Sequence, residues 1–166
     1  MNPQLEDLAS LYVLDQLAPG LLPDRLNPLL VVLAVALLIP IVVLAFVAPQ
    51  PPRLAQLAFL AVAAFLLVNK VWSPQYALWL LPLAALARPR WRDLLIWQAG
   101  EVLYFVVVWW HLATLYDSSN PLIGSRGYAM ATAIRIGCLA WLCAVVVRDL
   151  LHPLHDPVRP YLPAQS

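Results

Sequence analysis

The chain has 166 residues, of which 63% are hydrophobic and only 11% are charged, and its formal net charge is +1. A soluble domain carries about a quarter charged residues, and a short one leaves much of its surface in water, so this composition argues against an ordinary soluble fold. The near-zero net charge gives no reason to expect a nucleic-acid partner, and we expect the lipid bilayer to solvate much of the apolar surface.

The first 27 residues are acidic rather than basic. Their acidic residues are Glu6, Asp7, Asp15 and Asp24. A cleavable signal peptide needs a basic start that is followed at once by an apolar run, so none is expected here. We interpret residues 1–27 as an extracytoplasmic segment and expect this start to correspond to the interior of a longer protein.

Apolar runs of suitable length follow this segment. A transmembrane helix needs about 20 apolar residues. We therefore expect an all-α fold, a multi-spanning transmembrane bundle of about five helices. The expected spans are 28–48, 54–70, 74–87, 94–112 and 128–148. We expect Pro40 to kink the first span. The third is short, and its length is adequate only if it starts near Pro74, since proline suits a first helical turn.

The arginines predict an orientation. Arg53 lies in the first loop, three arginines lie between residues 88 and 92, and Arg148 and Arg159 follow the last span. Cytoplasmic loops carry an excess of Lys and Arg. We therefore expect the N-terminus outside and the Pro-rich tail 152–166, interpreted as irregular, in the cytoplasm of a bacterial plasma-membrane protein.

Two ionisable residues fall inside expected spans. Glu101 lies roughly 12 Å from the cytoplasmic end of the fourth span, and Arg135 lies roughly 12 Å from the outer end of the fifth. A charge in the bilayer is costly unless it is paired or wet. The sequence therefore predicts either an interhelical Glu101–Arg135 pair that stabilises the bundle or a polar cavity that these residues line.

Two further polar segments lie on the expected outer side. The stretch from Lys70 to Tyr76 holds a cation, a hydroxyl, an amide and two aromatic rings. A lysine suits a phosphate as a point charge, but an interfacial lysine flanked by aromatic residues has the same composition. The loop His111–Gly127 carries polar side chains that can bind a sugar, although a solvated loop explains them as well.

The stretch Asn69–Arg88, NKVWSPQYALWLLPLAALAR, resembles a signature near the C-terminus of multi-spanning membrane proteins of high-GC Gram-positive bacteria. These proteins are related to the family 87 glycosyltransferases of the GT-C superfamily. The segments Trp91–Leu94 and Glu101–Tyr104 look like the same proteins. The resemblance covers residues 5 to 150, and the run Lys70–Tyr76 is its most specific part.

The resemblance implies a hexosyltransferase that moves a mannose-like sugar from a polyprenyl-phosphate donor to a lipid or glycolipid acceptor at the outer face. It suggests Lys70, Ser73, Gln75 and Tyr76 as contacts to the donor phosphate. The family's catalytic aspartate lies in the first outer loop, which has no counterpart here, so no catalytic residue is assigned. We expect the chain to be a C-terminal portion of such an enzyme.

Two other readings remain open, a small transporter or channel-like protein that uses Glu101 and Arg135, and an inactive membrane subunit. No bound cofactor is expected, and no histidine or cysteine group has metal-ligand spacing. Cys138 and Cys143 lie five residues apart in an apolar run, which predicts small core residues and no disulfide.

Overall fold

The structure is a computed structural model that describes residues 26–69, 75–116 and 125–159. This part of the chain is all-helical, with the five α-helices α2 to α6 and one 3-10 turn, η2. The helices are α2 (Leu26–Val47), α3 (Leu54–Val68), α4 (Tyr76–Ala87), α5 (Trp91–Tyr116) and α6 (Ser125–Leu151), and η2 covers Pro153–His155. The predicted all-α class is confirmed for the described residues.

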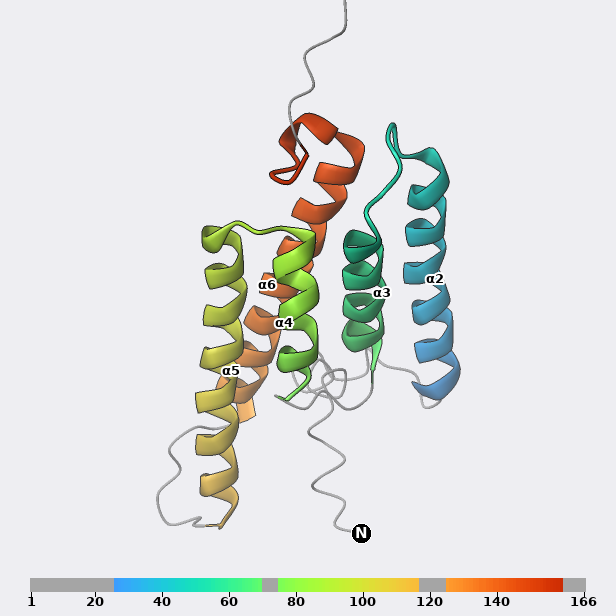
Figure 1. The fold of residues 1–166 in the computed structure, drawn as a ribbon. Coiled ribbons are helices and arrows are strands. Elements are labelled where there is room, and N and C mark those ends of the chain that lie inside the picture. Colours follow the sequence, from blue (N-terminus) through green and yellow to red (C-terminus); the bar gives the residue numbers. More distant parts are fainter. Residues whose placement is uncertain (1–25, 70–74, 117–124, 160–166) are drawn as a thin grey trace, which may run out of the picture.

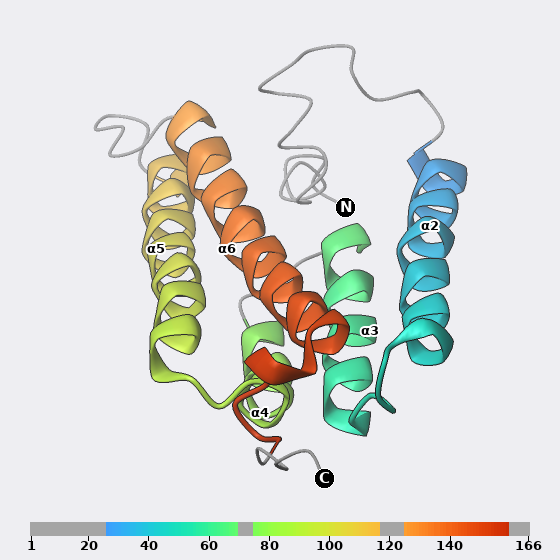
Figure 2. The ribbon, with the colours of Figure 1, turned by 90° about the horizontal axis from the view of Figure 1, so that it is seen from above.

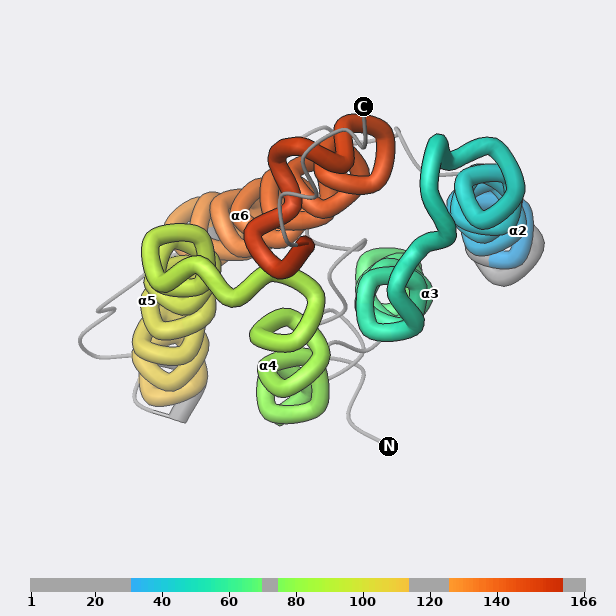
Figure 3. The backbone as a smooth tube through the Cα atoms, turned by 45° about the horizontal axis from the view of Figure 1, so that its top comes forward, coloured from blue at the N-terminus to red at the C-terminus, as the bar shows by residue number. Residues whose placement is uncertain are grey.

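Successive helices run in opposite directions, as Figure 1 shows. The α2–α3 connection, the α4–α5 connection and the C-terminal end of α6 therefore lie together at one end of the bundle, which we call the arginine end. Figure 2 shows α6 crossing obliquely between α5 and α3, with α2 at the outer edge beside α3. The contacts agree, because α5 packs along α6, and α3 contacts α2, α4 and α6 (Figure 3).

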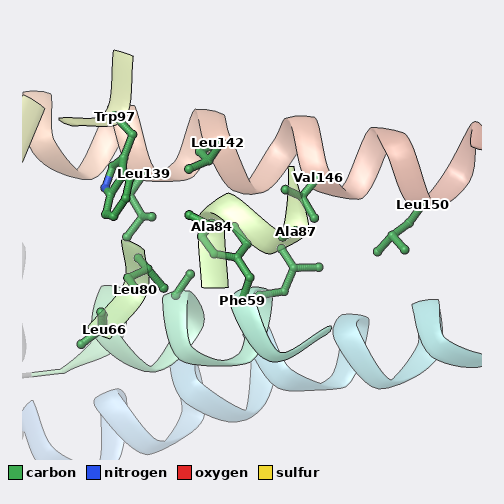
Figure 4. Close-up of a cluster of buried hydrophobic side chains, with 12 residues drawn as sticks. Phe59, Leu66, Leu80, Ala84, Ala87, Trp97, Leu139, Leu142, Val146 and Leu150 are labelled. Carbon is green, nitrogen blue, oxygen red and sulfur yellow. The ribbon is translucent and has the colours of Figure 1, made fainter. Parts of the chain in front are cut away.

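The main apolar core lies where α3, α4, α5 and α6 meet. Figure 4 shows side chains of these four helices pointing toward one another. Phe59 of α3, Trp97 of α5 and Leu139 of α6 are completely buried. Burial of these large side chains removes their apolar surface from the solvent. The same packing brings the polar residues on these helices into contact with one another.

The helix bounds differ from the predicted spans mainly at polar ends. The helix α5 begins at Trp91 and reaches Tyr116, and α6 covers residues 125–151, so both exceed the predicted 94–112 and 128–148. The predicted spans end where the first charged residues interrupt an apolar run. Asp93 nevertheless lies in the first turn of α5, where its negative charge stabilises the helix by complementing the helix dipole. At its other end α5 continues to Tyr116, so residues 113–116, interpreted as loop, are helical.

The tail after α6 is also more ordered than expected. The segment 152–159 contains η2 and carries the buried Asp156, whereas an irregular tail was predicted. The expected kink at Pro40 does not end α2, which continues through it. Residues 1–25 and 160–166 lie outside the described residues, so the proposed outer segment is not described.

Among the described residues, two helices are long and apolar enough to cross a membrane, judged by length and composition. They are α5 over Trp91–Ala113 and α6 over Arg126–Leu151. Three shorter apolar helical stretches accompany them, at Val31–Val47, Leu54–Val68 and Tyr76–Ala87. With its 12 residues α4 is about 18 Å long, less than the roughly 30 Å hydrocarbon thickness of a bilayer.

Candidate functional site

The middle of the α5–α6 contact holds the two ionisable residues singled out in the sequence. A terminal guanidinium nitrogen of Arg135 lies 2.8 Å from the Glu101 carboxylate. Both side chains are buried, at 1% and 8% exposure. Each residue lies ten positions, about 15 Å along the axis, from the start of its helix, and the two starts lie at opposite ends of this antiparallel pair. The two residues reach a similar depth because the helices are staggered, with Cα of Arg135 only 3.7 Å from a Cβ atom built on Gly100. The structure therefore brings the two residues together as an interhelical ion pair.

A glycine allows the two helices to approach closely beside this pair. A Cβ atom on Gly100 would lie 2.9 Å from Sγ of Cys138 and 3.0 Å from its Cβ. A side chain at position 100 would push α6 away from α5. The residue before Glu101 thus sets the helix separation that the short Glu101–Arg135 contact requires.

Further polar and aromatic groups continue from the ion pair toward the end of the bundle opposite the arginine end. The Arg135 guanidinium lies 4.2 Å from the ring centre of Tyr104, a cation–π contact. The hydroxyls of Tyr104 and Tyr128 are 3.1 Å apart, and the His111 ring stacks on Tyr128 with centres 4.9 Å apart.

We call this set the polar seam. Its members are Glu101, Tyr104 and His111 of α5 with Tyr128, Thr132 and Arg135 of α6. Their spacings of three, four and seven residues place each set on one helix face. The sequence analysis identified only the two charged members. Tyr104 lies three residues after Glu101, and Tyr128 lies seven residues before Arg135. This helical spacing could have identified the two tyrosines from the sequence.

The proposed donor-binding segment is only partly described. Lys70 and Ser73 lie outside the described residues. Gln75 is exposed and directly precedes α4, and the ring of Tyr76 lies 5.0 Å from that of Trp79. Asn69 ends α3 and Gln75 leads into α4 at the end opposite the arginine end (Figure 1). The structure therefore places two of the four phosphate-binding candidates, Gln75 and Tyr76, whereas Lys70 and Ser73 lie outside the described residues.

The outer loop predicted at His111–Gly127 is also only partly described. His111 belongs to α5 and Arg126 to α6, so both lie on helices. Residues 117–124, which include most of the polar side chains proposed there as sugar contacts, lie outside the described residues.

The arginine end contains ion pairs that the sequence analysis did not predict. Arg88, expected in an arginine-rich cytoplasmic loop, is completely buried and binds the carboxylates of both Asp93 and Asp149. Arg92 lies 3.3 Å from the other oxygen of Asp93, and Arg148 lies 3.6 Å from the other oxygen of Asp149. These five residues form a chain of alternating charge across the ends of α4, α5 and α6.

A second junction gathers around Asp156. Its carboxylate accepts hydrogen bonds from Arg53 Nη2 at 3.0 Å, Gln56 Nε2 at 3.2 Å and Arg159 Nε at 3.3 Å. Arg53 also donates to the carbonyl oxygens of Leu86 and Ala87 at the end of α4. One arginine thus satisfies carbonyls at a helix C-terminus and holds the segment after α6 against the start of α3.

No group of three or more His, Cys, Asp or Glu residues that could hold a metal ion occurs within residues 26–69, 75–116 and 125–159. Both cysteines, Cys138 and Cys143, are free thiols in the structure.

Comparison of the chain with protein-family models, with curated proteins and with solved structures finds no match in any of the three. The described part of the chain defines a class. It is all-helical, two of its helices can span a membrane by length and composition, and a buried ion pair joins these two helices.

Proposed function

We propose that this chain is an integral membrane protein whose helices form a multi-spanning bundle. The observation that carries the proposal is the exposure of large apolar side chains on the outward faces of the bundle. Phe46 of α2 is 85% exposed, Leu78 of α4 is 70% exposed and Val102 of α5 is 60% exposed. A soluble monomer rarely exposes contiguous apolar surface on this scale, whereas a bilayer solvates it.

The charge distribution supports an orientation for the bundle. Arg53, Arg88, Arg90, Arg92, Arg148 and Arg159 all lie at the arginine end. The positive-inside bias assigns that end to the cytoplasm of a bacterial plasma membrane and puts the 70–74 and 117–124 connections outside.

Alkaline extraction tests membrane integration, and cysteine labelling tests orientation. In whole cells an impermeant maleimide should label a cysteine placed at Gln75 and should not label one placed at Arg90, in a background without Cys138 and Cys143. Release of the protein by alkaline carbonate would overturn membrane integration. The reverse labelling pattern would overturn the orientation alone.

For activity, we propose that the bundle belongs to a hexosyltransferase that uses a polyprenyl-phosphate sugar donor. Support comes from the resemblance of Asn69–Arg88, a segment that runs from the end of α3 through α4. The four donor-phosphate candidates are Lys70, Ser73, Gln75 and Tyr76. A cation with hydroxyl and amide donors stabilises the charge on a departing lipid phosphate, while a carboxylate not assigned here deprotonates the acceptor hydroxyl.

Donor binding tests this activity without requiring turnover. The chain in phosphatidylcholine nanodiscs is titrated with polyprenyl-monophosphate mannose. Lys70→Ala should weaken binding by roughly tenfold, the effect of losing one charge-assisted hydrogen bond, and Lys70→Arg should retain most of it. Arg90→Gln is the control, because Arg90 is exposed and lies at the arginine end, outside Asn69–Arg88 and outside the loop proposed to bind a sugar. Equal binding by wild type and Lys70→Ala would contradict the donor-contact proposal.

The polar seam favours a second candidate function, transport of a small solute or proton. Ionisable residues inside a bundle mark transport pathways in many membrane proteins, and the seam continues from Glu101 to His111. Proteoliposomes loaded with a pH-sensitive dye and a panel of labelled solutes test this. Flux that Glu101→Gln abolishes would favour transport, and flat traces with wild-type protein would remove it.

A further inference from the structure

The helix α5 lies at one edge of the bundle, with α2 at the opposite edge (Figures 2 and 3). One row of side chains runs along the outer face of α5 at alternating intervals of four and three residues, the spacing of helices that pack as a left-handed pair. Except for the half-buried Gln98, each member is at least 50% exposed. We call this row the outer stripe, and its members are Trp91, Leu95, Gln98, Val102, Phe105 and Trp109.

Gln98 places an amide group in this otherwise apolar and aromatic row. Together with Leu95, Ala99 and Val102 it lines a shallow groove on the outer face of α5. Its Nε2 atom is covered but has no hydrogen-bond partner among the residues that the structure describes. The terminal amide of a glutamine rotates in a broad, roughly two-fold torsional well, so this N–H₂ group can turn into the groove.

The depth of Gln98 makes an unpaired amide costly. Gln98 lies seven residues after Trp91, about 10 Å along the helix axis, which is inside the hydrocarbon layer in the proposed placement of the bundle. Hydrocarbon offers no hydrogen bond, so a second polar group on an adjoining helix stabilises the amide. The outer stripe therefore needs a helical partner that carries a polar group at this depth.

The chemistry of the stripe favours a second copy of this chain as that partner. A glutamine amide has both donors and an acceptor, so two such amides complement each other. The tryptophans at the ends of the stripe are 18 residues, about 27 Å, apart, close to the roughly 30 Å hydrocarbon thickness. Tryptophan favours the membrane interfaces, so Trp91 and Trp109 hold α5 at one depth. Every copy inserted in the same orientation then presents Gln98 at the same level.

We propose that the outer stripe is a dimer interface at which α5 of one copy packs in parallel against α5 of a second copy. The two copies are related by a two-fold axis along the membrane normal, so the same surface serves both partners. The two Gln98 amides hydrogen-bond to each other, and the apolar members of the stripe pack on either side of them. One polar residue in such a row fixes the register of the two helices. The inference rests on the proposed placement of the bundle in a bilayer.

Disulfide cross-linking in membranes tests the interface. In a background without Cys138 and Cys143, Val102→Cys should yield a disulfide-linked dimer when membranes are oxidised with copper phenanthroline. Leu103→Cys is the matched control and should remain monomeric, because Leu103 is exposed on the same helix but lies about 100° around its axis from Val102. Equal cross-linking of both variants would indicate random collisions and would overturn the proposal. Cross-linking of Val102→Cys to a different protein would overturn the choice of partner.

Energy transfer between labelled copies tests the role of Gln98. The full chain, labelled at His155→Cys in the same background, is placed in phosphatidylcholine vesicles and diluted with lipid to obtain a dimerisation constant. Gln98→Leu should weaken dimerisation by about three- to tenfold, the effect of an interhelical hydrogen bond in a membrane, whereas Gln98→Asn keeps the amide and should retain most of it. Equal constants for wild type and Gln98→Leu would overturn the proposal. Release by alkaline carbonate would refute the proposed function, whereas a membrane-integrated monomer would refute this interface alone.

Discussion

The carboxylate of Asp156 lies 3.0 Å from the Arg53 guanidinium, across 103 residues of sequence. Arg53 precedes the first residue of α3, and Asp156 follows the last turn at the C-terminal end of the described chain. The contact joins the start of α3, the end of α4 and the segment after α6. The segment after α6, for which the sequence showed only a high proline content, therefore contributes to the stability of the bundle.

Asp156→Ala should lower the free energy of unfolding by about 2 kcal/mol, because it leaves Arg53 and Gln56 without their shared acceptor. The effect is smaller than for a fully buried pair, since the Arg53 side chain is 24% exposed. Thermal unfolding in detergent measures it. His155→Ala, at an exposed neighbour, serves as the control, and equal melting temperatures for wild type and Asp156→Ala would contradict the role of the junction.

The Glu101–Arg135 pair allows a double-mutant cycle. Either single change to Ala should destabilise the bundle by about 3 kcal/mol, because it leaves an unpaired charge among apolar helices. The double variant that carries Glu101→Ala and Arg135→Ala removes both charges and should recover much of the loss. Unfolding in bilayer-like detergent by steric trapping or denaturant gives the four free energies. Additive single effects would show that the two residues do not interact.

Gly100 should not tolerate a side chain. Gly100→Ala places a methyl group against Cys138 and should cost about 1–3 kcal/mol of stability, because the helix separation must increase. Gly137→Ala on α6 is the matched control, since a Cβ there meets nothing within 4 Å. It should be neutral or stabilising by up to about 1 kcal/mol from helix propensity. Equal stabilities of Gly100→Ala and Gly137→Ala would contradict this explanation. Addition of Cys138→Gly to Gly100→Ala should restore part of the lost stability.

Arg88 separates two buried carboxylates, so its loss should be more damaging than that of an exposed loop arginine. Arg88→Met should destabilise the bundle by about 3–5 kcal/mol, because Asp93 and Asp149 then repel each other without compensation. Arg88→Met with Asp93→Asn and Asp149→Asn should restore much of the stability. Arg90→Met is the control, and a comparable loss there would show that burial of Arg88 is not the cause.

Local composition and periodicity predicted much of the fold. Apolar run lengths located the five helices, because a run that excludes charge has few other stable conformations. For the two charges inside those runs, Glu101 and Arg135, the sequence left open an interhelical pair or a polar cavity, and the structure brings the two side chains together as a pair. The bounds of α5 and α6 were underestimated, because the helices continue into polar turns that run length does not detect.

The sequence by itself determined the all-helical class, the apolar character of the helices and the gathering of arginines in alternate connections. Only the tertiary structure decided which of those arginines face the surroundings and which are buried. Arg88 and Arg92 have the same charge and lie four residues apart, yet one is enclosed by Asp93 and Asp149 and the other is exposed. Asp149 lies on α6, 61 residues after Arg88 in the sequence. Local sequence carries no information on such a partner, because the pairing follows from how the ends of α4, α5 and α6 meet.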